Sequence, residues 1–211
     1  MPILTTLINF NDTDGVGVTA DLLADGAGNL FGTATSGGTN SNGTVFEIAK
    51  VDGTYASTPT TLVSFNGTNG ANPFAGLIAD AAGNLFGTTQ SGGTNGDGTV
   101  FEIANVDGSY ASTPTMLVSF NGTNGSTPFG GLIEDAAGNL FGTTQSGGTN
   151  DKGTVFGDRQ CRRYIRQYAD HTGQLQRHQW VLPFGRSDSR RRREPVRHDS
   201  VWWHERQWHS I

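Results

Sequence analysis

Cysteine, histidine and tryptophan are missing from residues 1–156. Without cysteine, this segment can form neither a disulfide nor a thiolate zinc site. It has no apolar run that approaches the length of a membrane-spanning helix, so no membrane span is predicted. Residues 1–10 also lack the basic region and the cleavage site of a signal peptide. Glycine and small polar residues dominate instead, which predicts many tight turns and no long helix.

Basic residues are almost absent from the same segment and are concentrated in the rest of the chain. Residues 1–156 contain two Lys and thirteen Asp or Glu, a net charge of −11. Residues 157–211 contain twelve Arg and six Asp or Glu, a net charge of +6, together with all four Trp, all five His and Cys161. A basic, aromatic tail of this kind usually suggests binding to nucleic acid or to a membrane surface.

The acidic segment is built from a repeat of 55 residues. The sequence Asn-Leu-Phe-Gly-Thr begins at Asn29, Asn84 and Asn139, so successive copies are 55 residues apart. The pattern is regular as far as Phe156, and the tail that follows is again 55 residues long. The chain therefore divides into three tandem repeats and a tail, at about 1–46, 47–101, 102–156 and 157–211.

The tail is interpreted as a fourth repeat translated in a shifted frame. Permitted codons for Tyr164–Trp180, read from one base later, encode TYASTPTTLVSFNGTNG, which is identical to Thr54–Gly70. Agreement of this length is not expected by chance. The choice among synonymous codons changes mainly one base of each shifted triplet, so the amino acids of the tail fix the other bases. We therefore predict that residues 157–211 are not a native domain and have no specific nucleic-acid partner, although their arginines attract polyanions non-specifically.

Each repeat contains four strand-like runs separated by turn residues. Apolar side chains recur at a spacing of two, as at Val63 and Phe65 or at Phe101 and Ile103, which is typical of a strand with one buried face. Asn, Asp and Gly between the runs favour tight turns. In the second repeat the predicted strands are Thr61–Asn66, Pro73–Ala79, Asn84–Gln90 and Thr99–Ala104.

This pattern predicts an all-β fold of tandem four-stranded units. A four-stranded unit at a fixed period is typical of a β-propeller blade, and neighbouring units must stack because one unit cannot bury its faces alone. Three intact units are fewer than the roughly four to eight blades of a closed ring. We predict an incomplete propeller-like ring, with a β-solenoid or an open stack of small sheets as the alternative. Met1 falls inside a repeat, so an internal piece of a longer gene is expected.

The repeated motifs resemble a known bacterial family. Gly-Leu-Ile-x-Asp-x-x-Gly-Asn-Leu-Phe-Gly-Thr-Thr occurs at Gly76–Thr89 and Gly131–Thr144, with Gly-Thr-Val-Phe-Glu-Ile at Gly98–Ile103 and Leu-Val-Ser-Phe at Leu62–Phe65. Over essentially all of the three repeats these motifs resemble the GloVer tandem repeat, from which the first copy departs at Gly15–Asp21. The resemblance implies that the full-length parent is extracellular or displayed at the cell surface. It carries over no catalytic residues.

Two acidic motifs are candidate ligand sites. Asp25, Asp80 and Asp135 recur before a turn that ends in Gly-Asn, and Asp-x-x-Gly favours a turn-capping carboxylate that accepts backbone N–H bonds. Asp12-Thr13-Asp14-Gly15 resembles the start of a calcium loop. Its carboxylates are not repeated in later copies and no Glu lies at the distal position of the loop, so no metal site is predicted.

Glu47 and Glu102 are a third acidic feature, because each follows Val-Phe in the last strand of a repeat. Paired carboxylates can act as acid and base on a glycoside. Equivalent units would hold these two residues far apart, so we predict exposed strand positions that alternate with apolar neighbours.

No catalytic, cofactor-binding or metal-binding residue is therefore predicted. The leading hypothesis is a non-enzymatic surface or extracellular repeat array, present here as a truncated fragment, for protein or glycan binding or for structural spacing. Its partner is unknown, and the repeat loops are where a protein or glycan would bind. The alternative is a fragment of a propeller enzyme that acts on polysaccharide. Near-identical repeats argue against the enzyme, because a catalytic site requires one unit to diverge.

The frame interpretation predicts the result of one nucleotide change. Deleting one base from the codons that span Phe156–Asp158 should restore Glu-Ile-Ala-Asn-Val after Phe156 and leave the frame open past Ile211. Sequencing the gene across these codons is the measurement. Codons for 157–211 that do not encode a repeat in the shifted frame would contradict it, and the tail would then count as a genuine basic domain.

Overall fold

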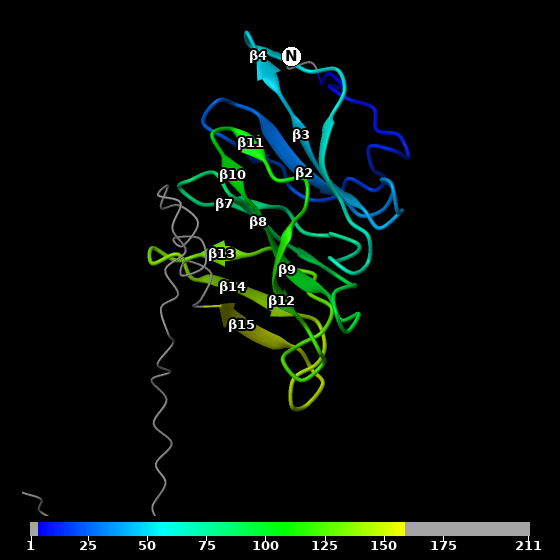
Figure 1. Cartoon of the computed structure of the whole chain (residues 1–211), viewed down its shortest axis with the longest axis vertical. Coiled ribbons are helices and arrows are strands. Elements are labelled where there is room, and N and C mark those ends of the chain that lie inside the picture. The colour runs from blue at the N-terminus through cyan, green and yellow to red at the C-terminus, as the bar shows by residue number, and fades with distance from the viewer. Residues whose placement is uncertain (1–3, 159–211) are drawn as a thin grey trace, which may run out of the picture. The chain divides into compact units, whose positions relative to one another are not determined.

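A computed structural model of the chain describes residues 4–158, and every regular element among them is a β-strand (Figure 1). Residues 159–211 lie outside the described residues, so all but the first two residues of the tail that the sequence assigns to a shifted frame are not described. A structural unit here is one sheet with the hairpin that follows its third strand, and it is offset from the 55-residue sequence repeats. The first unit contains β1 (Leu23–Ala24), β2 (Leu30–Ala34), β3 (Thr44–Ile48), β4 (Lys50–Val51), β5 (Thr54–Tyr55) and β6 (Thr60–Ser64). The second contains β7 (Ile78–Ala79), β8 (Leu85–Thr89), β9 (Thr99–Ile103), β10 (Asn105–Val106), β11 (Ser109–Tyr110) and β12 (Thr115–Ser119). The third contains β13 (Ile133–Glu134), β14 (Leu140–Thr144) and β15 (Thr154–Asp158).

The strands form a succession of small antiparallel sheets. The first sheet has the order β1-β2-β3-β6, the second has β7-β8-β9-β12, and the third has β13-β14-β15. Figure 1 shows these sheets one after another, in blue, green and yellow. The all-β prediction is confirmed, and the described residues fit the open stack of small sheets that was the alternative to a ring.

Three of the four predicted strands of the second repeat are confirmed, at Thr60–Ser64, Leu85–Thr89 and Thr99–Ile103. The strand predicted at Pro73–Ala79 is wrong except at its last two residues. Asn72 there has a left-handed backbone with φ of 56°, and Pro73 has no N–H to donate to a neighbouring strand. The chain therefore joins the sheet only after this bend.

A short hairpin follows the third strand of each of the first two units and was not predicted as a pair of strands. β4 pairs with β5 across Asp52-Gly53, and β10 pairs with β11 across Asp107-Gly108. Both residues of each turn have positive φ, 50° and 79° in the first and 51° and 83° in the second. This is the geometry of a two-residue type I′ turn, which Asp-Gly favours.

The hydrophobic core lies between successive sheets. One cluster joins the first sheet to the second, and another joins the second sheet to the third. Because each sheet contributes one face to each neighbouring cluster, no unit buries its apolar residues alone. The first cluster contains Phe31, Val45, Val63, Phe65, Leu77, Leu85, Phe101 and Ile103. The second contains Phe86, Val100, Phe120, Leu132 and Leu140, with Ile78, Leu117, Val118 and Phe156 packed against it.

An edge-to-face phenylalanine pair recurs at the same place in every 55-residue sequence repeat. The ring centroids of Phe65 and Phe101 are 5.1 Å apart, and those of Phe120 and Phe156 are 5.0 Å apart. Phe10 and Phe46 form the corresponding pair at 4.7 Å. The edge-to-face geometry is favoured for aromatic rings and adds about 0.5–1.5 kcal/mol to the burial of their area.

The glycine of the Leu-Phe-Gly-Thr motif makes room for one of these rings. Gly87 lies opposite Phe101 in the β8–β9 ladder. A Cβ at Gly87 would lie 2.6 Å from Cζ of Phe101 and 2.9 Å from Cδ2 of Leu77, which is closer than van der Waals contact allows. The motif therefore requires glycine for space and not for an unusual backbone angle.

Replacing this glycine is predicted to destabilise the fold. Gly87→Ala should lower the free energy of unfolding by about 1–3 kcal/mol, because the added methyl overpacks the core. Gly26→Ala is the matched control, since a Cβ there has nothing within 4 Å, and it should change the value by less than about 0.5 kcal/mol. Urea unfolding of both variants is the measurement. Equal effects at the two positions would contradict the packing argument.

Candidate functional site

An aspartate caps the turn between the first two strands of every unit. Oδ1 of Asp80 accepts hydrogen bonds from the backbone N–H groups of Ala82 and Asn84, each at 2.9 Å. Oδ2 of Asp80 accepts a further bond from the side-chain amide of Asn84, also at 2.9 Å. Asp25 and Asp135 accept the same three bonds in their own units. The prediction of turn-capping carboxylates is confirmed.

The asparagine of this turn binds the hairpin that follows. Oδ1 of Asn84 accepts a hydrogen bond of 2.8 Å from the backbone N–H of Asn105, at the start of β10. Asn29 accepts the equivalent bond from the backbone N–H of Lys50, also at 2.8 Å. The Asp-x-x-Gly-Asn motif thus closes its own turn and fixes the hairpin against the end of the sheet.

Hydrogen bonding also lowers the pKa of Asp135, the exposed one of the three turn aspartates. The side-chain amide of Asn139, followed by its backbone N–H, lowers the pKa of Asp135, because each bond favours the charged carboxylate. The turn is therefore stabilised by an ionised aspartate at neutral pH. This role is structural, since both carboxylate oxygens already accept bonds from the turn.

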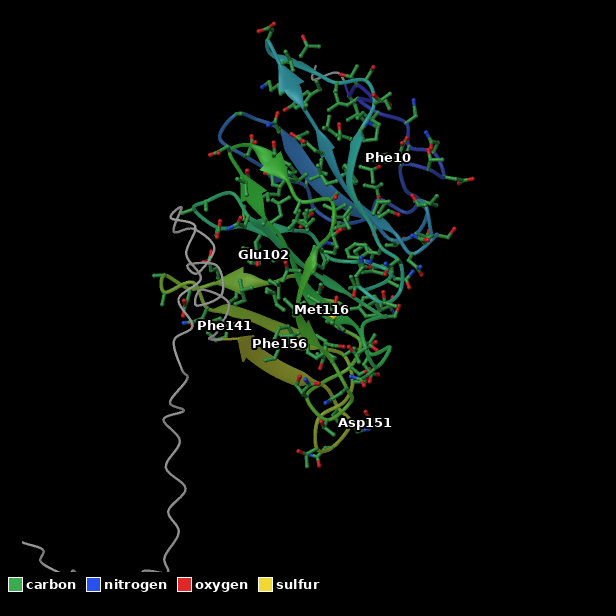
Figure 2. The ribbon with its side chains drawn as sticks, in the orientation of Figure 1. Phe10, Glu102, Met116, Phe141, Asp151 and Phe156 are labelled. Atoms are coloured by element: carbon green, nitrogen blue, oxygen red, sulfur yellow. The ribbon has the colours of Figure 1, made fainter. Side chains whose placement is uncertain are left out.

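Glu102 is buried, contrary to the prediction that it would be exposed (Figure 2). It lies opposite Phe86 in the β8–β9 ladder, and only 5% of its surface is accessible. Burial raises the pKa of Glu102 to about 7, and the negative charge of Asp80 contributes a second, smaller part of the rise. The alternation of side chains correctly placed Glu102 on the face of the strand opposite Phe101 and Ile103. Alternation does not reveal whether another part of the protein covers that face.

Glu47 has the same position in the first unit and is half-buried. Burial, followed by the charge of Asp25, raises its pKa as well. Each glutamate is therefore paired with the turn aspartate of its own unit, and not with the glutamate of another unit. Sequence spacing did not reveal this carboxylate neighbour of each glutamate.

Tyr110 brings the second unit to the acidic pair of the first. Its ring packs edge-to-face on Phe31, with centroids 5.3 Å apart. Burial raises the pKa of the Tyr110 phenol, a hydrogen bond with Asn105 lowers it in part, and the charges of Glu47 and Asp25 raise it further. The hairpin that carries Tyr110 thus reaches back over the preceding sheet.

A carboxyl group with a pKa near 7 can donate or accept a proton at neutral pH, which is a common property of catalytic acids. The burial of Glu102 argues for a packing role, since a substrate atom must reach a general acid. Residues 4–158 contain no group of three or more His, Cys, Asp or Glu side chains placed to hold a metal ion.

A family model described as the Gloeobacter/Verrucomicrobia repeat matches residues 2–177. The chain belongs to this repeat family. The match spans all three described units and confirms the resemblance to the GloVer repeat. It also runs past Phe156, so the match itself marks no boundary where the sequence predicts a change of frame. No curated protein matches the chain.

The calcium-like loop of this Gloeobacter/Verrucomicrobia repeat chain is a turn closed by asparagine. Oδ1 of Asn11 accepts hydrogen bonds from the backbone N–H groups of Thr13 at 2.8 Å and Asp14 at 3.2 Å. The side-chain amide of Asn11 in turn donates to the Asp14 carboxylate. Asn66 and Asn69 build the corresponding turn of the next repeat with reciprocal bonds of 2.9 and 3.0 Å. The aspartate of the first copy therefore stands in for an asparagine.

Two exposed phenylalanines are the surface feature that the sequence analysis missed. Phe74 and Phe129 are each 39% exposed, and their ring centroids are 4.9 Å apart. Their spacing of one repeat is the signal that could have identified them. Phe74 instead fell within the strand predicted at Pro73–Ala79. Among residues 4–158 no helix is long and apolar enough to cross a membrane.

The raised pKa of Glu102 makes stability depend on pH. Between about pH 4.5 and 7 the carboxyl of Glu102 holds a proton in the folded protein that it has released in the unfolded chain. The protonated carboxyl therefore contributes fully to the free energy of unfolding below pH 4.5, and this contribution is lost as the pH rises through about 7. Glu102→Gln should therefore be more stable than the parent at pH 8, by on the order of 1 kcal/mol after a discount for solvent screening. Urea unfolding at pH 4.5 and pH 8 tests this. A difference that is the same at both pH values would contradict the raised pKa.

Proposed function

We propose that the chain is part of a non-enzymatic repeat array, outside the bacterial cell or at its surface, that binds protein or glycan or acts as a structural spacer. The observation that carries the proposal is the identical hydrogen bonding of Asp25, Asp80 and Asp135. The polar residues that repeat most regularly serve the turns of every unit. Chemistry confined to one unit would require local divergence, and these residues do not diverge.

The proposal includes a propeller-like arrangement of the parent array. Successive antiparallel sheets of four, four and three strands, with a shared core between neighbours, support it. Three units fit part of such a ring, and further units would complete it. Export of the parent rests on the family to which the chain belongs.

The proposed binding surface centres on Phe74 and Phe129. Their neighbouring rings present apolar area that the fold leaves open to solvent. Aromatic rings contribute large, rigid contact area at low entropic cost and are common at binding surfaces. The apolar face of a sugar ring or an apolar side chain of a protein could pack on them.

A polysaccharide-acting enzyme is the second candidate, and one observation favours it. Glu102 and Asp80 interact electrostatically, and the raised pKa of Glu102 keeps much of this carboxyl protonated at neutral pH. A pair of carboxyl groups of which one holds a proton at neutral pH is an arrangement that glycoside hydrolases use. The burial of Glu102 places this candidate second.

Binding to polysaccharides tests the proposal. Cosedimentation of the full chain with a panel of insoluble glycans, such as cellulose, chitin and xylan, should show retention on at least one of them. Phe74→Ala with Phe129→Ala should weaken retention at least about tenfold, because one aromatic contact contributes on the order of 1–2 kcal/mol. Val51→Ala with Val106→Ala is the matched control at two other exposed positions one repeat apart.

The same experiment separates the candidates. Equal retention of the two double variants would contradict binding by the phenylalanine pair. Release of soluble sugar that Glu102→Gln abolishes would replace the binding array with the enzyme. A chain that is retained on no glycan would leave protein binding or spacing as the role.

A further inference from the structure

The outer face of the third sheet exposes residues that are buried in the other two. Val155 on β15 is 82% exposed, whereas Val45 and Val100, at the same place in the first and second sheets, are 0% and 1% exposed. All three valines lie in the sequence Gly-Thr-Val-Phe. The difference therefore comes from what lies against each sheet and not from the local sequence.

The residues beside Val155 follow the same trend. Phe141, labelled on β14 in Figure 2, is half-buried, while the equivalent Phe31 and Phe86 are buried. Thr143 is exposed, while the equivalent Thr33 and Thr88 are buried. We define the outer face of the third sheet by four side chains that are more exposed than their counterparts: Ile133, Phe141, Thr143 and Val155.

The first two units show what covers this surface. Against Phe31, Val45 and Val63 of the first sheet, the second unit places an apolar set of two leucines, a phenylalanine and an isoleucine. Tyr110 packs on Phe31 from the hairpin of that second unit. The covering residues are Leu77, Leu85, Phe101, Ile103 and Tyr110.

Polar bonds accompany this apolar contact at both existing junctions. The hydroxyl of Thr33 donates to the carbonyl of Ala75 at 3.1 Å, and the hydroxyl of Thr88 donates to the carbonyl of Gly130 at 3.2 Å. The exposed Thr143 occupies the corresponding place on the third sheet. A unit seated there would offer a backbone carbonyl to Thr143 in the same way.

From these equivalences we infer that the outer face of the third sheet is a docking surface for one further repeat unit, joined to the chain after Phe156. The occupant carries leucine at the positions of Leu77 and Leu85 and phenylalanine at the position of Phe101, as Leu132, Leu140 and Phe156 do at the second junction. A second copy of this chain fits less well. Of the residues that it would offer, Phe46 and Ile48 are already 0% and 4% exposed and Phe10 packs on Phe46, while Leu22, the counterpart of Leu77, is 49% exposed.

Cysteine labelling of position 155 tests the inference in two chains of 211 residues. One is the present chain with Cys161→Ser and Val155→Cys. The other consists of residues 1–156 followed by a second copy of Glu102–Phe156, with Val155→Cys in its first copy only. Maleimide should label the present chain rapidly and the extended chain at least tenfold more slowly, because the added unit covers the face. Val100→Cys in each chain is the control for intact sheets and should react slowly in both.

Several results would overturn the inference. Equally rapid labelling of position 155 in the two chains would mean that the added unit does not dock. Slow labelling in the present chain at low protein concentration would mean that the face is already covered. Protection that appears only as the present chain is concentrated would assign the surface to a second copy.

Rapid labelling of Val100→Cys in the extended chain would show that the duplicated unit disrupts the sheets. A second extended chain is then needed. In this chain, which also carries Val155→Cys, the deletion of one base near Phe156 supplies the added unit. That unit should slow the labelling of position 155 at least tenfold as well. Failure of both extended chains to protect position 155 would overturn the inference.

Discussion

Every part of this structure depends on burial between neighbouring sheets. A sheet of four short strands exposes apolar side chains on both faces, and no helix among the described residues covers either face. Phe101 illustrates the solution: its own sheet holds it against Gly87, while Phe65 of the preceding sheet packs on its ring. Stability therefore accumulates along the chain as interfaces between units, as in other repeat proteins.

The same packing decides the chemistry of the acidic residues. The turn aspartates lie at the ends of the sheets and are held by bonds within four residues, so their role is local. Glu102 lies within a strand whose face is covered, and burial raises its pKa before any charge is considered. The two carboxylates of this unit thus have different roles, because Glu102 is buried within the packed sheets and Asp80 caps a turn.

The elements that could be predicted were those with a strong local pattern. The strand at Thr99–Ile103, in which Phe101 and Ile103 flank Glu102, was found within one residue of its ends. The strand at Leu85–Thr89, which carries the repeated Leu-Phe-Gly-Thr motif, was found equally closely. The hairpin at Asn105–Tyr110 was recognised only as an Asp-Gly turn, because its two-residue strands are too short to show alternation. The exposed pair Phe74 and Phe129 was missed, since aromatic residues look the same in a sequence whether they fill a core or stand on a surface.

The sequence by itself determined the 55-residue period, the all-β class and the geometry of the turns. Those features depend on hydrogen bonds and backbone angles within a few residues, as in the Asp-x-x-Gly-Asn turn and the Asp-Gly hairpin. Only the tertiary structure decided which faces are covered. Val45, Val100 and Val155 share one local sequence, yet two are buried and one is open to solvent. Burial is a property of what packs against a residue, and for these valines that is a unit whose residues lie elsewhere in the chain.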